Sequence, residues 1–170
     1  IELPRYRALF LDATLRDQEA IFVEKNRVFR GLVRNMKTVE DNDFEVPGAL
    51  QSVLREYQKK GFLWLKTLKH NGFGGILADD MGLGKTLQVI AFLCSEYTEA
   101  CMRCLIVTPA SLVYNWYNEF EKFAPHLPAV MVLGSAQERE RLIAKAPEQA
   151  ILITSYDLLK RDIEHYEKLN

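Results

Sequence analysis

The sequence predicts an α/β fold in which an open, mostly parallel sheet has helices on both faces and follows a short helical extension. Three observations support this prediction. From residue 50 onward, apolar runs of strand length alternate with helical patterns. Runs of this kind are apolar throughout, as in strands buried between two layers of helices. A glycine-rich loop follows the first run and leads into a helix, a strand–loop–helix order that recurs in open α/β sheets.

The composition indicates one ordinary globular domain with an appendage. The chain has 170 residues, of which 48% are hydrophobic and 26% charged. It carries 22 Lys and Arg against 23 Asp and Glu, so it lacks the overall positive charge of many nucleic-acid-binding domains. Any contact with DNA or RNA must therefore come from a local patch. No apolar run approaches the roughly 20 residues of a membrane span, and no signal-peptide pattern is present. Because residue 1 is Ile1, we expect a piece of a longer protein.

Residues 1–46 form the predicted helical extension. Apolar residues between Ile21 and Met36 recur at helical spacing. On this helix, a 3-4-3 spacing places four positive charges on one face: Arg27, Arg30, Arg34 and Lys37. This stripe is either a solvated face or a contact for phosphate or an acidic partner. An acidic stretch at 40–43 and the pair Pro47-Gly48 mark the boundary.

The second part, residues 47–170, starts with a helix and a strand. Ser52 is a candidate N-cap for a helix through Leu54 and Leu65. The apolar run 75–78 predicts the first strand, and 87–97 predicts the helix after the glycine-rich loop. The elements expected after it are strands at 104–108, 129–133 and 150–154 and helices at 111–123, at 136–145 and from Tyr156. Ligands of such sheets bind at the carboxyl ends of the strands, where the loop, Thr108 and Thr154 lie.

The loop Asp79–Thr86 carries the strongest chemical signal. Its glycines allow backbone N–H groups to approach a polyphosphate, and the following helix N-terminus adds unpaired donors. Lys85 would reach the β- and γ-phosphates, and the Thr86 hydroxyl would ligate Mg²⁺. The strict P-loop pattern has glycine where this chain has Asp79, so the backbone there must suit an L-residue. The alternative is a helix start that merely contains Gly-Lys-Thr.

The cysteines do not indicate a disulfide framework or a zinc site. Cys94, Cys101 and Cys104 are an odd number, and the single C-x-x-C has no second pair. His126 and His165 are isolated. We expect reduced thiols.

Four motifs in order resemble those of the Swi/Snf-type ATPases, the DNA translocases and chromatin remodellers of the superfamily-two helicase group. The resemblance covers residues 50 to about 162 and includes Asp79 as a family residue. Asn115-Trp116 after Thr-Pro-Ala-Ser-Leu separates this family from the DEAD-box RNA helicases, and Glu56 stands where proline is common. The matching segments are Leu54–Leu65, Asp79–Thr86, Thr108–Trp116 and Ile153–Leu159, with Gly134 and Arg139 between the last two. The helical extension is similar to the segment before the ATPase in bacterial members.

The resemblance implies a first RecA-like lobe with ATP and Mg²⁺ as cofactors and double-stranded DNA as partner. Gln58 would hydrogen-bond adenine. The phosphates would be bound by Met81, Gly82, Leu83, Gly84, Lys85 and Thr86, with Lys85 and Thr86 catalytic and Thr86 the metal ligand. The phosphate backbone of DNA would be contacted by Thr108, Pro109, Ser111, Thr154 and Ser155. Trp116 is expected to anchor the core.

Two catalytic parts of this family do not occur in the sequence: the acidic Asp-Glu motif and the second RecA-like lobe with its arginine finger. We therefore expect the 170-residue piece to be catalytically incompetent, although the parent protein would be an ATP-dependent translocase. Alternatives are a non-catalytic, nucleotide-gated interaction module and an RNA helicase lobe. Further expected partners are DNA-bound proteins or polymerase. The expected location is the bacterial cytoplasm at the nucleoid, or the nucleus in a eukaryote.

Overall fold

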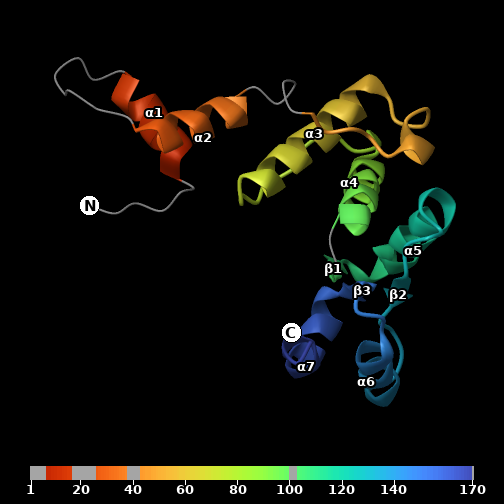
Figure 1. The fold of residues 1–170 in the computed structure, drawn as a ribbon. Coiled ribbons are helices and arrows are strands. Elements are labelled where there is room, and N and C mark those ends of the chain that lie inside the picture. Colours follow the sequence, from red (N-terminus) through yellow and green to blue (C-terminus); the bar gives the residue numbers. More distant parts are fainter. Residues whose placement is uncertain (1–6, 17–25, 38–42, 100–102, 170) are drawn as a thin grey trace.

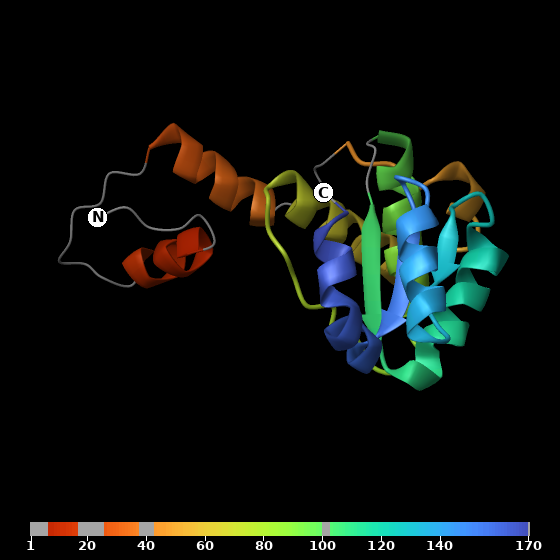
Figure 2. The same ribbon diagram turned by 90° about the horizontal axis from the view of Figure 1, so that it is seen from below.

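The computed structural model describes residues 7–16, 26–37, 43–99 and 103–169. Within them, three parallel strands form one sheet in the spatial order β1-β3-β2 (Figure 2): β1 (Cys104–Thr108), β2 (Ala129–Met131) and β3 (Ile151–Ser155). Because β3 is last in sequence but central in space, parallel crossovers connect the strands, and each crossover is helical. This is the open parallel sheet that the sequence predicts.

The strands form where the sequence is apolar on both faces. All five residues of β3 are buried, as expected for a central strand covered by helices. Thr108 pairs with Ser155 at the carboxyl ends of β1 and β3, and Met131 pairs with Ile153. β2 ends two residues before the predicted Leu133, although the Val132 amide still donates to the Ile153 carbonyl at 2.9 Å.

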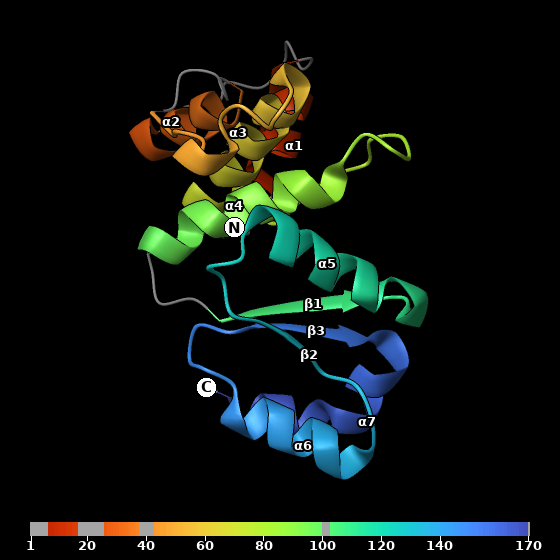
Figure 3. The same cartoon turned by 90° about the vertical axis from the view of Figure 1, so that its right-hand side faces the viewer.

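Helices cover both faces of the sheet (Figure 3). On one face lies α5 (Val113–Phe123), followed outward by α4 (Lys85–Glu99) and α3 (Glu56–His70). On the other face lie α6 (Ala136–Lys145) and α7 (Tyr156–Glu167). The larger core joins Phe62 of α3, Ile90 of α4 and Phe120 of α5 to the sheet. Short 3-10 turns, η3 (Gly48–Leu50) and η4 (Ala110–Leu112), precede α3 and α5.

The layer formed by α6 and α7 is fixed by a cap and an ion pair. Gly134 has a φ of 98°, which favours glycine, and Ser135 then caps α6 in a capping box with Glu138. Arg139 of α6 donates to both carboxylate oxygens of Asp162 on α7, at 2.6 and 2.8 Å, and to the Gly134 carbonyl at 2.7 Å. The Asp162 carboxylate raises the pKa of Arg139 further above its ordinary value. A bidentate, buried pair of this kind defines one angle between the two helices.

The prediction of a strand at 75–78 is wrong for this structure. Within residues 43–99 no strand is present, and Ile76 is 86% exposed. Gly75 instead lies against the side chains of Trp64 and Leu68 on α3, so close that a Cβ there would overlap them. A four-residue apolar run becomes a strand only where a neighbouring strand offers hydrogen bonds, and the segment is adjacent to a helix instead. The segment therefore leads into α4 from outside the sheet (Figure 3).

The predicted cap of α3 is also wrong. Ser52 lies before the helix, which begins at Glu56 with Arg55 as its N-cap residue. The Gln58 Oε1 atom accepts from the Arg55 amide at 2.9 Å, so a residue inside the first turn satisfies the free donor.

The helical extension is described in part. α1 (Ala8–Arg16) packs against α2 (Arg27–Lys37), and α2 contacts α3 (Figure 1). Residues 21–25 of the predicted helix lie outside the described residues. Arg27, Arg30 and Arg34 are exposed on α2, consistent with either interpretation of the basic stripe.

Candidate nucleotide and nucleic-acid site

The glycine-rich loop has the backbone that its sequence predicts. Gly82 and Gly84 have φ values of 86° and 70°, in the left-handed region that favours glycine. Among the described residues, positive φ occurs at glycines alone, so Asp79 has a backbone that suits an L-residue. α4 begins at Lys85, immediately after the loop. The loop therefore presents a helix N-terminus of the kind that binds anions.

Lys85 is folded back onto the loop. Its Nζ atom donates to the main-chain oxygens of Asp79 and Asp80, at 2.7 and 2.8 Å. These carbonyls partly neutralise the ammonium, which a phosphate could do more strongly because it is charged. Met81 is 97% exposed, and Thr86 is half-buried in the first turn of α4.

Gln58 contacts the loop rather than open space. Its Nε2 atom donates to the Leu83 carbonyl at 3.1 Å, and a Cβ on Gly84 would overlap that nitrogen. Its Oε1 atom is the cap of α3, so both polar atoms have partners within the chain. Tyr57, to which the sequence assigns no role, also donates to the Leu83 carbonyl at 3.1 Å. The first turn of α3 thus holds the end of the loop.

A second glutamine holds the start of the loop. Gln88 of α4 donates from Nε2 to the Asp79 carboxylate at 3.3 Å. Sequence reasoning missed this residue, although a glutamine in the otherwise apolar stretch from Leu87 to Leu93 is the signal that could have indicated it.

The five candidate DNA-contact residues fall into two groups. Thr108 and Ser155 are paired across β1 and β3 at the carboxyl edge of the sheet, and Pro109 and Ser111 are exposed just beyond β1. Thr154 is fully buried, and its hydroxyl donates to the Val132 carbonyl at 3.4 Å. The Ser155 hydroxyl accepts from the Leu158 amide at 3.4 Å and caps α7. The exposed surface of this set therefore comes from Pro109 and Ser111.

The loop and the strand ends lie at one end of the molecule. Figure 3 shows the segment entering α4 at the same end as the arrowheads of β1 and β3. This is the edge at which open α/β sheets bind ligands. Trp116 packs with the core and against Phe120, with ring centroids 6.3 Å apart, as the prediction of a core anchor requires.

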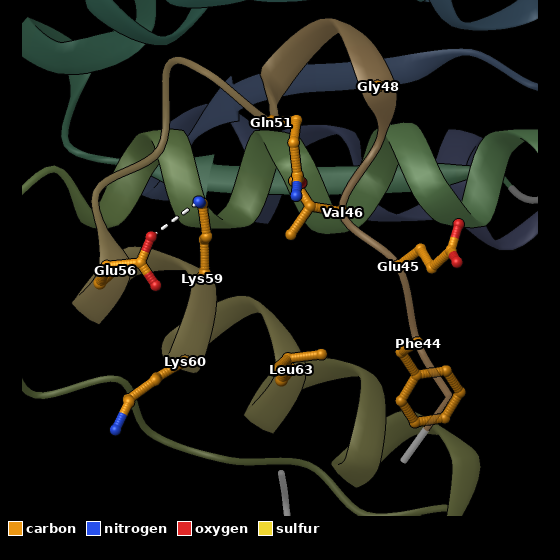
Figure 4. A pocket seen from close by; sticks show the side chains of 9 residues that line it. All are labelled: Phe44, Glu45, Val46, Gly48, Gln51, Glu56, Lys59, Lys60 and Leu63. Atoms are coloured by element: carbon orange, nitrogen blue, oxygen red, sulfur yellow. Dashed lines mark hydrogen bonds and ion pairs between the residues drawn. The ribbon is translucent and has the colours of Figure 1, made fainter. Parts of the chain in front are cut away.

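Away from the loop, a hollow lies between the segment 44–51 and one side of α3 (Figure 4). It has a volume of about 820 Å³ and is bordered by Phe44, Val46 and Leu63 together with an ion pair, Glu56–Lys59, at 2.8 Å. The Lys59 ammonium donates to the Glu56 carboxylate and so lowers the pKa of Glu56. Because Gln58 points to the loop and not into this hollow, the hollow is separate from the phosphate loop.

Among the described residues, Cys94 and Cys104 are free, and burial raises the pKa of each thiol to about 11, so both stay protonated at neutral pH. Cys101 lies outside the described residues. No group of three or more His, Cys, Asp or Glu in the described part could hold a metal. None of the helices described is long and apolar enough to cross a membrane.

Comparison with known families identifies the chain. The family model described as the SNF2-related domain matches residues 57–170, more than half of the chain. The chain belongs to the SNF2-related family. A second model, described as bacterial SNF2 helicase associated, matches residues 1–47 of this SNF2-related chain.

Relatives and a solved structure agree with this assignment. An uncharacterized ATP-dependent helicase of Mycoplasma genitalium is 42% identical over 133 residues, covering 76% of this chain and 13% of the relative. The TATA-binding protein-associated factor mot1 of Aspergillus fumigatus is 36% identical over 160 residues, covering 86% and 8%. The Sulfolobus solfataricus SWI2/SNF2 ATPase core in complex with dsDNA is 41% identical with a TM-score of 0.59, covering 65% and 23%. The chain thus spans a small part of each relative, and its fold is RecA-like.

Proposed function

We propose that this chain is the nucleotide-binding part of an ATP-dependent translocase that moves on double-stranded DNA. The observation that carries the proposal is the loop Asp79–Thr86, which ends in a lysine at the N-terminus of α4 and lies at the carboxyl end of the sheet. Membership of the SNF2-related family supports ATP as the nucleotide.

The loop residues fit a nucleoside triphosphate. A Cβ placed on Gly82 would meet nothing within 4 Å, so the loop borders open space. The backbone of Met81, Gly82, Leu83 and Gly84 would donate to phosphate oxygens, and Lys85 would exchange its two carbonyl acceptors for the β- and γ-phosphates. Thr86 would ligate Mg²⁺, which supplies charge neutralisation during phosphoryl transfer.

Adenine recognition is assigned to Gln58. Its side-chain amide has the donor and acceptor that adenine requires. Nε2 uses one of its two N–H groups on Leu83, and Oε1 uses one lone pair on the Arg55 amide, so the remaining donor and acceptor would bind the base while Gln58 still holds the loop. Base binding and loop conformation are therefore linked in this proposal.

The DNA contact is assigned to the carboxyl edge of the sheet. Pro109 and Ser111 are exposed there, next to the pair of Thr108 and Ser155. Hydroxyls and helix N-termini can bind phosphate oxygens without reading sequence, which suits a motor that tracks any DNA. Thr154, which is buried on β3, would support the edge through its hydrogen bond to the Val132 carbonyl. The double-stranded DNA bound to the related Sulfolobus core supports this choice of partner.

The parent protein would contain two lobes and a helical extension. Residues 1–46 would be a helical extension and 47–170 the first RecA-like lobe, with a second lobe in cis closing around ATP. Further partners would be DNA-bound proteins or polymerase, in the bacterial cytoplasm or in a nucleus.

The deciding experiment is the ATPase activity of the full-length protein with duplex DNA, with RNA and with neither. We expect stimulation by duplex DNA and its loss in Lys85→Ala, because the lysine neutralises phosphate charge in the transition state. Stimulation by RNA alone would favour an RNA helicase lobe, and binding without turnover would favour a nucleotide-gated interaction module. Unchanged activity in Lys85→Ala would disprove the nucleotide site.

A further inference from the structure

Gln88 occupies an unusual place for a polar side chain. It is 0% exposed, on a helix turn next to the buried Ile90 and Ala91. Its amide fills the space left by Gly61 of α3, where a Cβ would overlap Oε1. The two helices therefore approach closely around this amide.

The hydrogen bonds of Gln88 are incomplete. Nε2 donates to Asp79 Oδ2 at 3.3 Å, whereas Oε1 has no partner in the described structure. A buried polar atom without a partner destabilises the folded state. A leucine of similar size would avoid that cost, so the side-chain bond to Asp79 is the feature that sets the glutamine apart from an apolar residue.

Asp79 offers Lys85 two different acceptors, a neutral main-chain carbonyl and a charged carboxylate. Its main-chain oxygen accepts from Lys85 Nζ at 2.7 Å. Its carboxylate belongs to an exposed residue and is an alternative, stronger partner for the same ammonium, since charged pairs are roughly twice as strong as neutral ones. A carboxylate on Lys85 would compete with a nucleotide phosphate for that lysine. In the structure the carboxylate accepts a hydrogen bond from Gln88 instead.

We propose that Gln88 is a positioning residue that keeps the Asp79 carboxylate away from Lys85, so that the lysine stays available to a polyphosphate. The inference rests on the proposed nucleotide function of the loop. Gln88 acts through Asp79 and touches no phosphate itself. It also gives a physical role to Asp79, the residue that replaces the glycine of the strict loop pattern.

The test uses the full-length protein and a fluorescent ATP derivative in equilibrium titrations. Gln88→Leu keeps the volume and removes the bond, and we expect about tenfold weaker binding, the effect of one such interaction. Adding Asp79→Asn to this variant removes the competing charge and should restore affinity to within about twofold of wild type. A role of Gln88 in packing alone would not be relieved by a change at the exposed Asp79. Gln137→Leu, at an exposed position of α6, is the matched control and should bind normally.

The outcomes distinguish the role of Gln88 from the nucleotide function of the loop. Wild-type affinity in Gln88→Leu, or weak binding that Asp79→Asn does not restore, overturns the inference. If Gln88→Leu does not fold, Asp79→Asn and Asp79→Ala decide instead: both should bind at least as tightly as wild type, and a loss above about fivefold in either refutes the role of the charge. Lys85→Ala separates the two levels, because retained binding there means that the nucleotide site itself is wrong.

Discussion

At the residue scale, two glutamines and one lysine determine the shape of the phosphate loop. Gln58 donates to the Leu83 carbonyl, and Gln88 donates to the Asp79 carboxylate. Lys85 donates to main-chain carbonyls at the start of the loop. The glycines are required for a different reason at each position. Gly82 borders open space, whereas Gly84 lies directly against Gln58. The loop is therefore ordered by side chains from α3 and α4 before any phosphate binds.

Gly84→Ala tests this arrangement. A Cβ at residue 84 meets both a φ of 70° and the Gln58 amide, so the loop and the first turn of α3 must separate. We expect ATP binding to weaken by about tenfold or more, measured by titration of the full-length protein. Gly48→Ala is the control, because a Cβ there meets nothing within 4 Å and the residue has no positive φ. Equal affinity of the two variants would contradict the prediction.

At the scale of elements, α3 and α4 are joined by a buried charge cluster. Lys66 and Lys69 of α3 both bind the Glu96 carboxylate of α4, at 2.7 and 3.0 Å, and Glu96 is 6% exposed. Lys66 also lies 5.3 Å from the ring centroid of Phe44. Gln58 lies in the first turn of α3, and Lys85 is the first residue of α4. The cluster therefore holds together the two helices that carry the site.

Glu96→Ala is expected to lower the free energy of unfolding by about 3–5 kcal/mol, since it leaves buried lysine charge without its partner. Urea denaturation at neutral pH measures this loss. Glu140→Ala, at an exposed position of α6, should change stability by less than about 0.5 kcal/mol. A loss for Glu96→Ala as small as that of the control would show that the cluster does not hold the helices together.

The contacts of Glu96 with Lys66 and Lys69 also make the free energy of unfolding depend on pH. Burial alone would raise the pKa of Glu96, but hydrogen bonds from Lys66 and Lys69 outweigh it, and the pKa lies below its ordinary 4.5. A lowered pKa means that the stabilisation is present above the ordinary value and is lost as the pH falls through the lowered one. The difference between wild type and Glu96→Ala should therefore narrow in acid, and a difference that is constant from pH 7 to pH 3 would refute it.

At the scale of the whole molecule, the sequence predicted the layers correctly but predicted one strand, at 75–78, that the structure does not contain. Central strands such as Ile151–Ser155 were predictable because burial on both faces leaves a continuous apolar run. The run at 75–78 is also apolar, but whether it pairs as a strand depends on neighbours distant in sequence. Likewise the φ of Gly82 could be predicted from its type, whereas the burial of Thr154 under the Val132 carbonyl is a property of tertiary packing.

The isolated 170-residue chain should hydrolyse ATP at a negligible rate. Phosphoryl transfer needs charge neutralisation that an acidic motif and an arginine finger supply in P-loop hydrolases of this kind. Phosphate release measured with and without duplex DNA checks this. A DNA-stimulated turnover of about 1 s⁻¹ or more would show that these residues suffice.

The detached segment at 75–78 has a practical consequence for purified protein. Ile76 is 86% exposed, and Leu105 on the edge strand β1 is 40% exposed. An exposed apolar segment and an unpaired sheet edge can each act as a template for strand addition between molecules. At high concentration the isolated chain should therefore self-associate through these two surfaces while its helices stay folded. The degree of self-association would then show whether the segment 75–78, which precedes the nucleotide loop, is exposed.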